Sequence, residues 1–157
     1  MDTEAVYQKP TEEEVKTLLT EKFPGIVEIT KLEERRIYGK LKRENVHEVM
    51  TYIRDNLTYE HCSVVMGVDY IDHMTVVYLI SNYWNGHMIE LDVDLPNDDL
   101  HVESVTDLWQ GANWHERETY ELFGIIFDNH PKLERLLTPK TYEFYPFRKS
   151  YKLRSQE

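Results

Sequence analysis

The chain has a single cysteine, Cys62, among its 157 residues. One thiol can form neither an internal disulfide nor a multi-cysteine metal site within the chain. Cys62 lies in the mostly apolar run 61–66, so we interpret it as a small buried core residue. The sequence also lacks a glycine-rich phosphate-binding loop and any clustered set of metal ligands. We therefore expect no catalytic, cofactor-binding or metal site in this chain.

Long hydrophobic runs are also missing. No stretch approaches the roughly 20 apolar residues that a membrane-spanning helix needs, and no positively charged start precedes an apolar segment as in a signal peptide. We expect a soluble, cytoplasmic chain with no direct membrane insertion, whose place at the cell membrane is peripheral and comes through partner subunits.

Charge is unevenly distributed along the chain. The net charge is −11, yet residues 131–157 carry seven Lys or Arg against three Glu, a local charge of +4. An acidic body disfavours nucleic acid and anionic membrane surfaces as partners. A basic tail on an acidic body indicates that the tail docks, on its own domain or on a partner.

Two amphipathic helices are predicted early in the chain. Thr11 and Glu14 have the spacing of a capping box, and the helix that they begin should end near Phe23. Apolar residues then recur at the spacing of one helix face. They are Val46, Val49, Met50, Ile53 and Leu57.

Five strands are predicted, over 26–30, 36–41, 62–68, 74–81 and 87–95. In the last of them Glu90, Asp92 and Asp94 alternate with apolar residues, so one sheet face should be buried and the other acidic and solvated. Alternate strand positions do not wrap an ion as a calcium loop does. We interpret this carboxylate row as a solvated sheet face rather than a calcium site.

The element order predicts an α+β fold. Two helices pack on a mostly antiparallel sheet of about five strands, and a short helix and an extended C-terminal tail follow. We place the domain at residues 1–137 and the tail at 138–157.

Residues 104–124 carry the most unusual pattern. Ser104 and Asp107 frame one short helix start, and Asn113 and Glu116 frame another. The second helix should run over about 114–123 and end at Gly124. Its apolar side chains point nearly all round the axis, which predicts burial against a second surface besides the sheet.

The charged residues of this helix allow several interpretations. Arg117 and Glu121 stand four residues apart and can pair, while Glu116 is expected to cap the helix. Alternatively, Glu116, Glu118 and Glu121 form the site of a free-standing acidic hydrolase or hold a metal. The neighbouring sequence lacks the second histidine of a zinc helix, which favours capping and ion pairing.

Two histidine-containing segments have similar alternatives. Asp69, Asp72 and His73 lie between two predicted strands, where Asp is an ordinary turn residue, and we prefer that interpretation to a ligand site. His130 precedes Pro131 and is biased to an extended conformation. We interpret it as a turn histidine or an interface contact rather than a proton relay.

The tail combines aromatic and cationic residues without a helical or alternating pattern. Such composition disfavours solvated disorder and is typical of interface anchors. Its aromatic residues are Tyr142, Phe144, Tyr145, Phe147 and Tyr151, and its cations include Arg148 and Lys149.

Residues 111–139, with a Glu-Arg-Glu triplet followed by a His-Pro turn, resemble the 30 kDa-type (C) subunit of NADH:quinone oxidoreductase, the complex I family. A weaker likeness extends back to Leu95 and forward to Tyr151. In the tail, residues 143–146 (Glu-Phe-Tyr-Pro) depart from the family's usual Glu-Gly-His-Pro.

The resemblance implies a structural role rather than a reaction. It implies a non-catalytic scaffold subunit of the quinone-reducing module, in the peripheral arm of a membrane-associated, ion-translocating respiratory complex. The partners would be the large hydrogenase-like subunit and neighbouring iron–sulfur subunits, which with others hold the iron–sulfur clusters, flavin and quinone-type carrier. Relatives are fed by NADH, reduced deazaflavin or ferredoxin through other subunits.

We expect the partner interface to be formed by the Glu-Arg-Glu helix, the His-Pro turn and the tail. Its residues are Trp114, Glu116, Arg117, Glu118, Glu121, His130, Pro131, Arg135, Tyr142, Phe144, Tyr145, Phe147, Arg148 and Lys149.

Overall fold

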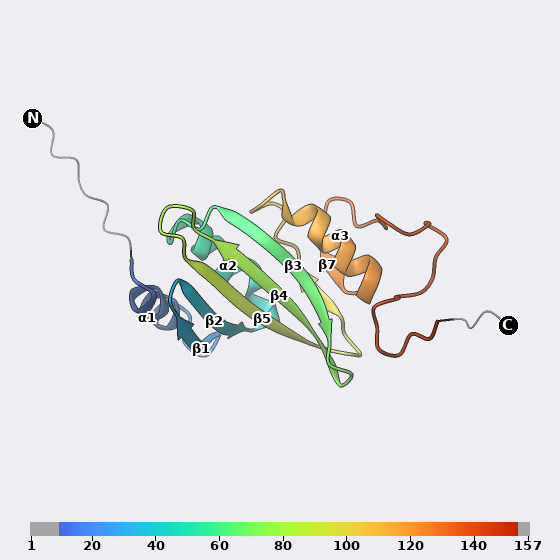
Figure 1. Ribbon diagram of the computed structural model, residues 1–157, viewed down its shortest axis with the longest axis horizontal. Coiled ribbons are helices and arrows are strands. Elements are labelled where there is room, and N and C mark those ends of the chain that lie inside the picture. Colours follow the sequence, from blue (N-terminus) through green and yellow to red (C-terminus); the bar gives the residue numbers. More distant parts are fainter. Residues whose placement is uncertain (1–9, 154–157) are drawn as a thin grey trace, which may run out of the picture.

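A computed structural model describes residues 10–153 of the chain (Figure 1). Residues 1–9 of the predicted domain and 154–157 of the predicted tail lie outside this range. The helices are α1 (Glu12–Lys22), α2 (Val46–Asp55) and α3 (Ala112–Phe123), with a 3₁₀ turn η1 at Arg43–Asn45. The strands are β1 (Val27–Glu33), β2 (Arg36–Leu41), β3 (His61–Asp69), β4 (His73–Ser81), β5 (Met88–Pro96), β6 (His101–Glu103) and β7 (Ile126–Asp128).

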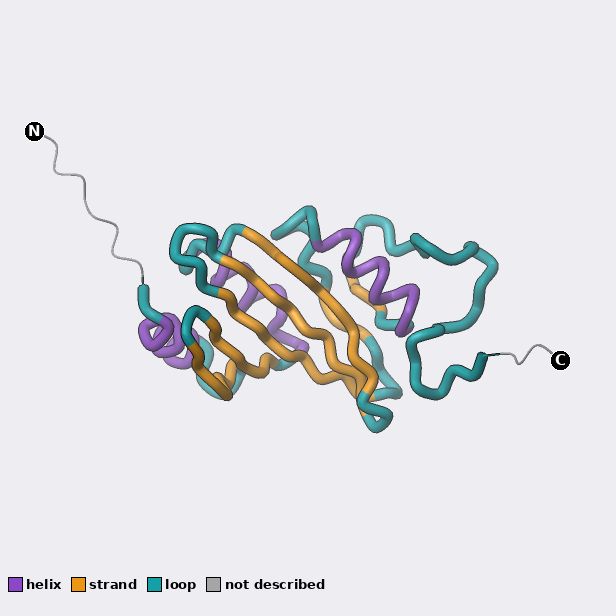
Figure 2. Tube along the Cα trace, in the orientation of Figure 1, coloured by secondary structure: helices purple, strands orange, loops and turns teal. Residues whose placement is uncertain are grey.

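The main sheet has the strand order β1-β2-β5-β4-β3. Three of its four strand pairs are antiparallel, and β2 with β5 is the parallel one. The chain leaves β2 through α2 and returns by the β3–β4 hairpin, so β5 can fill the position beside β2. The predicted α+β fold with a mostly antiparallel five-stranded sheet is confirmed (Figure 2).

The first two helices form as the sequence predicts. Thr11 accepts the N–H of Glu14 and the Glu14 carboxylate accepts the N–H of Thr11, which completes the capping box of α1. Phe23 and Tyr52, from the ends of α1 and α2, meet edge to face with ring centroids 5.3 Å apart. Both helices bury their apolar stripes in one continuous core with the sheet.

Alternation along β5 separates the two faces of the sheet. Ile89, Leu91, Val93 and Leu95 are fully buried in that core. On the other face the carboxylates are partly solvated: Lys40 forms an ion pair with Asp94 at 2.8 Å. Burial and mutual repulsion raise the pKa of Asp92.

The region after β5 differs from the prediction in two respects. β6 and β7, absent from the predicted elements, pair in parallel as a separate two-stranded sheet. Residues 106–108 form a turn, so Ser104 and Asp107 do not start a helix. The reason is that both side chains bind groups outside their own segment, as described below. No helix within residues 10–153 is long and apolar enough to cross a membrane.

Candidate partner-binding surface

The third helix lies against the edge strand β3. The Thr119 hydroxyl donates to the Val65 carbonyl at 3.2 Å. At Gly67 an added Cβ would come within 2.8 Å of the Phe123 ring and 3.1 Å of Thr119. A glycine therefore lets the helix approach the strand closely, and the approach fixes which side of α3 remains for other contacts.

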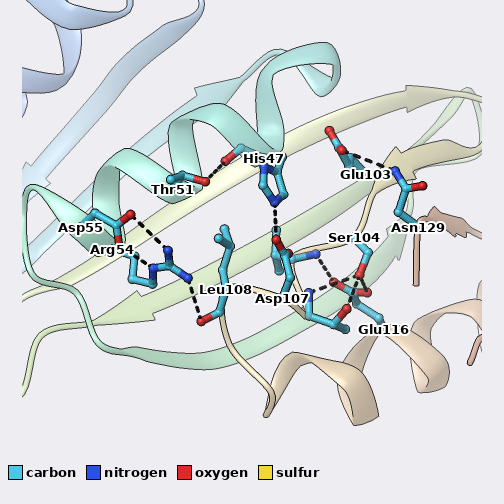
Figure 3. Close-up of polar contacts among 12 residues, drawn as sticks. His47, Thr51, Arg54, Asp55, Glu103, Ser104, Asp107, Leu108, Glu116 and Asn129 are labelled. Atoms are coloured by element: carbon cyan, nitrogen blue, oxygen red, sulfur yellow. Dashed lines mark hydrogen bonds and ion pairs between the residues drawn. The ribbon is translucent and has the colours of Figure 1, made fainter. Parts of the chain in front are cut away.

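The linker before α3 is held against α2 as well (Figure 3). The His47 imidazole and the Asp107 carboxylate lie 2.8 Å apart, and an Arg54 Nη atom donates to the Leu108 carbonyl at 3.4 Å. These contacts hold residues 107–108 as a strap between two helices, which explains why no helix starts here.

Glu116 binds this linker instead of capping its own helix. The residue is fully buried; its carboxylate accepts the Ser104 hydroxyl at 2.6 Å and the Val105 N–H at 2.8 Å (Figure 3). Burial raises its pKa to about 7 despite these two bonds. The capping prediction is wrong because α3 begins at Ala112, which moves Glu116 beyond the free N–H groups of the first turn.

Asn113 is likewise not the start of the helix. Gly111 occupies the N-cap position and makes no side-chain cap bond. The predicted C-terminal end is confirmed, because Gly124 adopts the left-handed conformation with φ +77°.

His130 turns its ring into the chain. Its side chain is fully buried, and Nδ1 accepts the Lys132 N–H at 3.0 Å. Nε2 faces the Asn113 carbonyl at 3.4 Å and the Glu116 carboxylate at 4.0 Å. Burial lowers the pKa of His130, so the neutral ring with its proton on Nε2 fits this setting. The following residue, Pro131, is exposed.

Glu121 binds the segment that leaves the domain. Its buried carboxylate accepts the consecutive backbone N–H groups of Leu136, Leu137 and Thr138. Burial by itself would raise the pKa of Glu121, but these hydrogen bonds outweigh it and the pKa is lowered. A carboxylate that accepts several backbone N–H groups is held in its charged form.

Arg117 does not pair with Glu121. Its Nε donates to the Glu134 carbonyl at 3.0 Å, and its guanidinium lies 5.4 Å from the Trp114 ring centroid. The predicted ion pair is wrong because the N–H groups of 136–138 already occupy the Glu121 carboxylate. Glu118 is exposed.

The three glutamates therefore do not share a site. Glu116 faces 104–105, Glu121 faces 136–138, and Glu118 faces solvent. No group of three or more His, Cys, Asp or Glu side chains within residues 10–153 is arranged to hold a metal ion. The geometry does not support the alternative of an acidic hydrolase centred on these residues.

The tail packs on its own domain at the C-terminal end of α3. Arg148 Nε donates to the Phe123 carbonyl at 2.6 Å, and the Phe147 N–H donates to the Leu122 carbonyl at 3.1 Å. The Lys149 N–H donates to the Asp69 carboxylate at 2.7 Å, across to the end of β3. The tail thus supplies part of the second surface that the helix pattern predicts.

Arg135 ties the start of the tail to its aromatic part. One Nη atom donates to the Glu121 carbonyl and the other to the Phe144 carbonyl, at 3.3 and 3.0 Å. The guanidinium also lies 5.6 Å from the Tyr142 ring centroid and 5.5 Å from that of Tyr145. The aromatic part of the tail is therefore held close to α3.

Large apolar side chains remain exposed on α3 and on the segment that covers it. Trp114 is 58% exposed, and beside it lies a hollow of about 500 Å³. The hollow is lined by Thr106, Asp107, Gln110, Asn113, Trp114, Asn129 and Pro131. Leu137, Phe144 and Phe147 are 68%, 52% and 61% exposed. Such groups, rimmed by Arg148 and Lys149, have the composition of an interface.

Two residues of this region are not predictable from the spacing of the sequence. Ser104 receives Glu116 and Asp69 receives the tail, yet neither has a periodic signal. For Asp69 a signal was available, because an Asp that closes a strand often caps the following turn.

Comparison with known proteins identifies the family. The model of the "respiratory-chain NADH dehydrogenase, 30 Kd subunit" family matches residues 40–157. The C subunit of the F(420)H(2) dehydrogenase of Methanosarcina mazei is 39% identical over 137 residues, which cover 85% of this chain and 87% of the relative. The C subunit of the NADH-quinone oxidoreductase of Salinispora tropica is 35% identical over 90% of this chain, and the match spans 61% of that longer protein.

Solved structures agree. A trypsin-resistant fragment of Nqo5 superposes with a TM-score of 0.67 at 28% identity, covering 77% of this chain and 98% of the fragment. A chain of the membrane-bound sulfane sulfur reductase, an archaeal respiratory membrane complex, gives 0.75 at 21% identity, covering 90% of this chain and 85% of that chain. The second likeness concerns the fold alone. On its residues and its fold, this chain belongs to the family of the 30 Kd subunit of the respiratory-chain NADH dehydrogenase.

Proposed function

We propose that this chain is a scaffold subunit, without an active site of its own, of a complex I-like electron-transfer complex. It braces the quinone-reducing module in the peripheral arm of a membrane-associated complex that couples electron transfer to ion translocation. The membership of relatives in NADH-quinone oxidoreductases and in an F(420)H(2) dehydrogenase supports this assignment.

One observation carries the proposal. Trp114, Phe144 and Phe147 are each more than half exposed, although they belong to the part of the chain whose backbone is most tightly bound to α3. A segment that fixes its backbone and leaves its aromatic rings in water is arranged to bury those rings elsewhere. A partner protein supplies that burial.

The partners proposed are the large hydrogenase-like subunit and the iron–sulfur subunits beside it. Those and other subunits carry the iron–sulfur clusters, the flavin and the quinone-type carrier, and they contact the electron donor. The acidic balance of the chain, with a net charge of −11, disfavours nucleic acid as a partner.

The test uses the tagged full chain expressed in its native cells. The variant Trp114→Ala/Phe147→Ala should lose at least tenfold in its co-migration with the large hydrogenase-like subunit on native gels. Its free energy of unfolding should change little, because both side chains are mostly exposed. Interface aromatics commonly lose at least ~2 kcal/mol of binding when truncated to alanine.

Leu18→Ala is the matched control. Leu18 is 41% exposed, but it lies on α1, away from α3 and the tail. It should leave co-migration unchanged. If the double variant stays in the complex as the wild type does, or if the wild-type chain never associates with cluster-bearing subunits, the proposed function is wrong.

A further inference from the structure

The turn between β3 and β4 holds a β-branched residue in a backbone conformation that such residues avoid. Ile71 has φ +77°. Positive φ at the first central position of a tight hairpin turn is the place of Gly, Asn or Asp, and for a β-branched residue it is a genuine outlier. The strain gains nothing from burial within this chain, because 72% of Ile71 is exposed.

The surrounding contacts fix this conformation from several sides. The Ile71 N–H donates to the Asp69 carboxylate and the Ile71 carbonyl accepts from the Asn97 amide, both at 2.7 Å. The Tyr70 N–H donates to the His73 carbonyl at 3.0 Å, and the rings of these two residues stack with centroids 5.0 Å apart. Strained residues persist where the surroundings over-determine them, and they cluster at functional sites.

The turn is joined to the tail. The second oxygen of Asp69 accepts the Lys149 N–H at 2.7 Å, so one buried carboxylate organises both segments. Figure 1 shows the hairpin projecting from the end of the sheet beside the tail. A hollow of about 260 Å³ between them is lined by Asp69, Ile71, Met74, Asn97, Arg148, Lys149 and Ser150.

The exposed groups of this composite surface are apolar with a cationic border. Tyr70 is 50% exposed and Phe147 is 61% exposed. Lys149 and Lys152 form no ion pair within residues 10–153. The exposed carboxylate at the tip, Asp72, lies 3.0 Å from the His73 imidazole.

We propose that the turn Asp69–His73, together with residues 147–149 of the tail, is a second docking element, which inserts into an apolar hollow rimmed by carboxylates on a partner protein. The cations of the tail match such a rim. A lipid surface fits less well, because a chain with a net charge of −11 is repelled by anionic headgroups. The inference rests on the proposed function, since the partner belongs to the same complex.

The experiment separates strain from binding. Ile71→Asn in the full chain relieves the backbone and removes the apolar side chain, because Asn tolerates positive φ. The midpoint of thermal unfolding should rise by roughly 2–4 °C, while the amount of complex that contains the chain falls at least fivefold on native gels. Ile71→Leu keeps an apolar side chain and should retain assembly within twofold.

Arg35→Asn is the matched control. Arg35 also has positive φ, +63°, in the β1–β2 turn, and the strand register places that turn at the opposite end of the sheet from His73. Its assembly should be unchanged. If Ile71→Asn assembles like the wild type, or if Ile71→Leu loses assembly as fully as Ile71→Asn does, the inference is overturned.

A photoreactive phenylalanine analogue at position 70, activated in the assembled complex, identifies the occupant. Cross-links to a partner segment that combines apolar residues with Asp or Glu support the inference. Cross-links to lipid or to a second copy of this chain, or none at all, overturn it. These results are distinct from failure of the proposed function, in which the wild-type chain itself does not assemble.

Discussion

The Glu121 carboxylate accepts the backbone N–H of Leu137, 16 residues further along the chain, at 2.8 Å. Together with the bonds to Leu136 and Thr138, this contact closes the loop between α3 and the tail. Glu121 therefore determines where the tail begins its course.

Glu121→Ala should destabilise the fold and loosen the tail. The change leaves three backbone N–H groups without their charged acceptor, and the loss of hydrogen bonds to a charged group costs about 2–3 kcal/mol. Urea unfolding measures the loss. Glu118→Ala, exposed on the same helix, should change the free energy of unfolding by less than ~0.5 kcal/mol. Equal effects of the two variants would contradict this assignment.

The buried Glu116 should make stability depend on pH in a defined direction. Its pKa in the folded chain is raised from 4.5 to about 7, so folding favours the protonated form. The resulting stability is fully present below pH 4.5 and is lost as pH rises through about 7.

Glu116→Gln should therefore gain stability relative to the wild type as pH rises from 4.5 to 7, by on the order of 2–3 kcal/mol. The difference between the two unfolding curves isolates this group from His130. The lowered pKa of His130 acts oppositely, because its stability is present above pH 6.5 and is lost as pH falls through the folded value. A flat difference curve between pH 4.5 and 7 would mean that Glu116 stays charged.

Gly124 and Gly25 form a matched pair that tests tail packing. Both have positive φ, +77° and +69°. A Cβ at Gly124 would lie 2.6 Å from the Arg148 side chain and 2.8 Å from the Tyr145 ring, whereas a Cβ at Gly25 meets nothing within 4 Å. Gly25→Ala should cost ~1–2 kcal/mol from the backbone alone.

Gly124→Ala should cost roughly 1–3 kcal/mol more through the clash, or else release the tail. Limited proteolysis after Arg148 or Lys149, followed by mass spectrometry, distinguishes the two results. Equal stability and equal cleavage for both variants would show that residues 145–148 do not pack over Gly124.

Arg117→Met should cost about 1–2 kcal/mol of folding stability. The variant keeps the stem of the side chain but removes the donor to the Glu134 carbonyl. A buried ion pair broken on one side typically costs roughly 3–5 kcal/mol. A loss in that higher range, measured by urea unfolding, would restore the ion pair with Glu121 that the geometry rejects.

Local spacing determined most of the scaffold. The capping box at Thr11, the stripe of α2 and the alternation of β5 each follow from neighbouring residues, because the helix and strand periods act within a few positions. The stop at Gly124 follows similarly from the conformational freedom of glycine. The Glu-Arg-Glu segment also indicated the family, which the family model confirms.

Only the tertiary structure decided the partners of the buried charges. Glu116 binds residues 11 and 12 positions before it, and Glu121 binds residues 15–17 positions after it. The parallel pairing of β2 with β5 and the contact of Lys149 with Asp69 bridge still longer separations. A carboxylate in a helix takes whichever donors the folded chain brings to it, and loops brought together by folding leave no periodic trace in the sequence. That is why the sequence placed these residues on a helix without revealing what they hold.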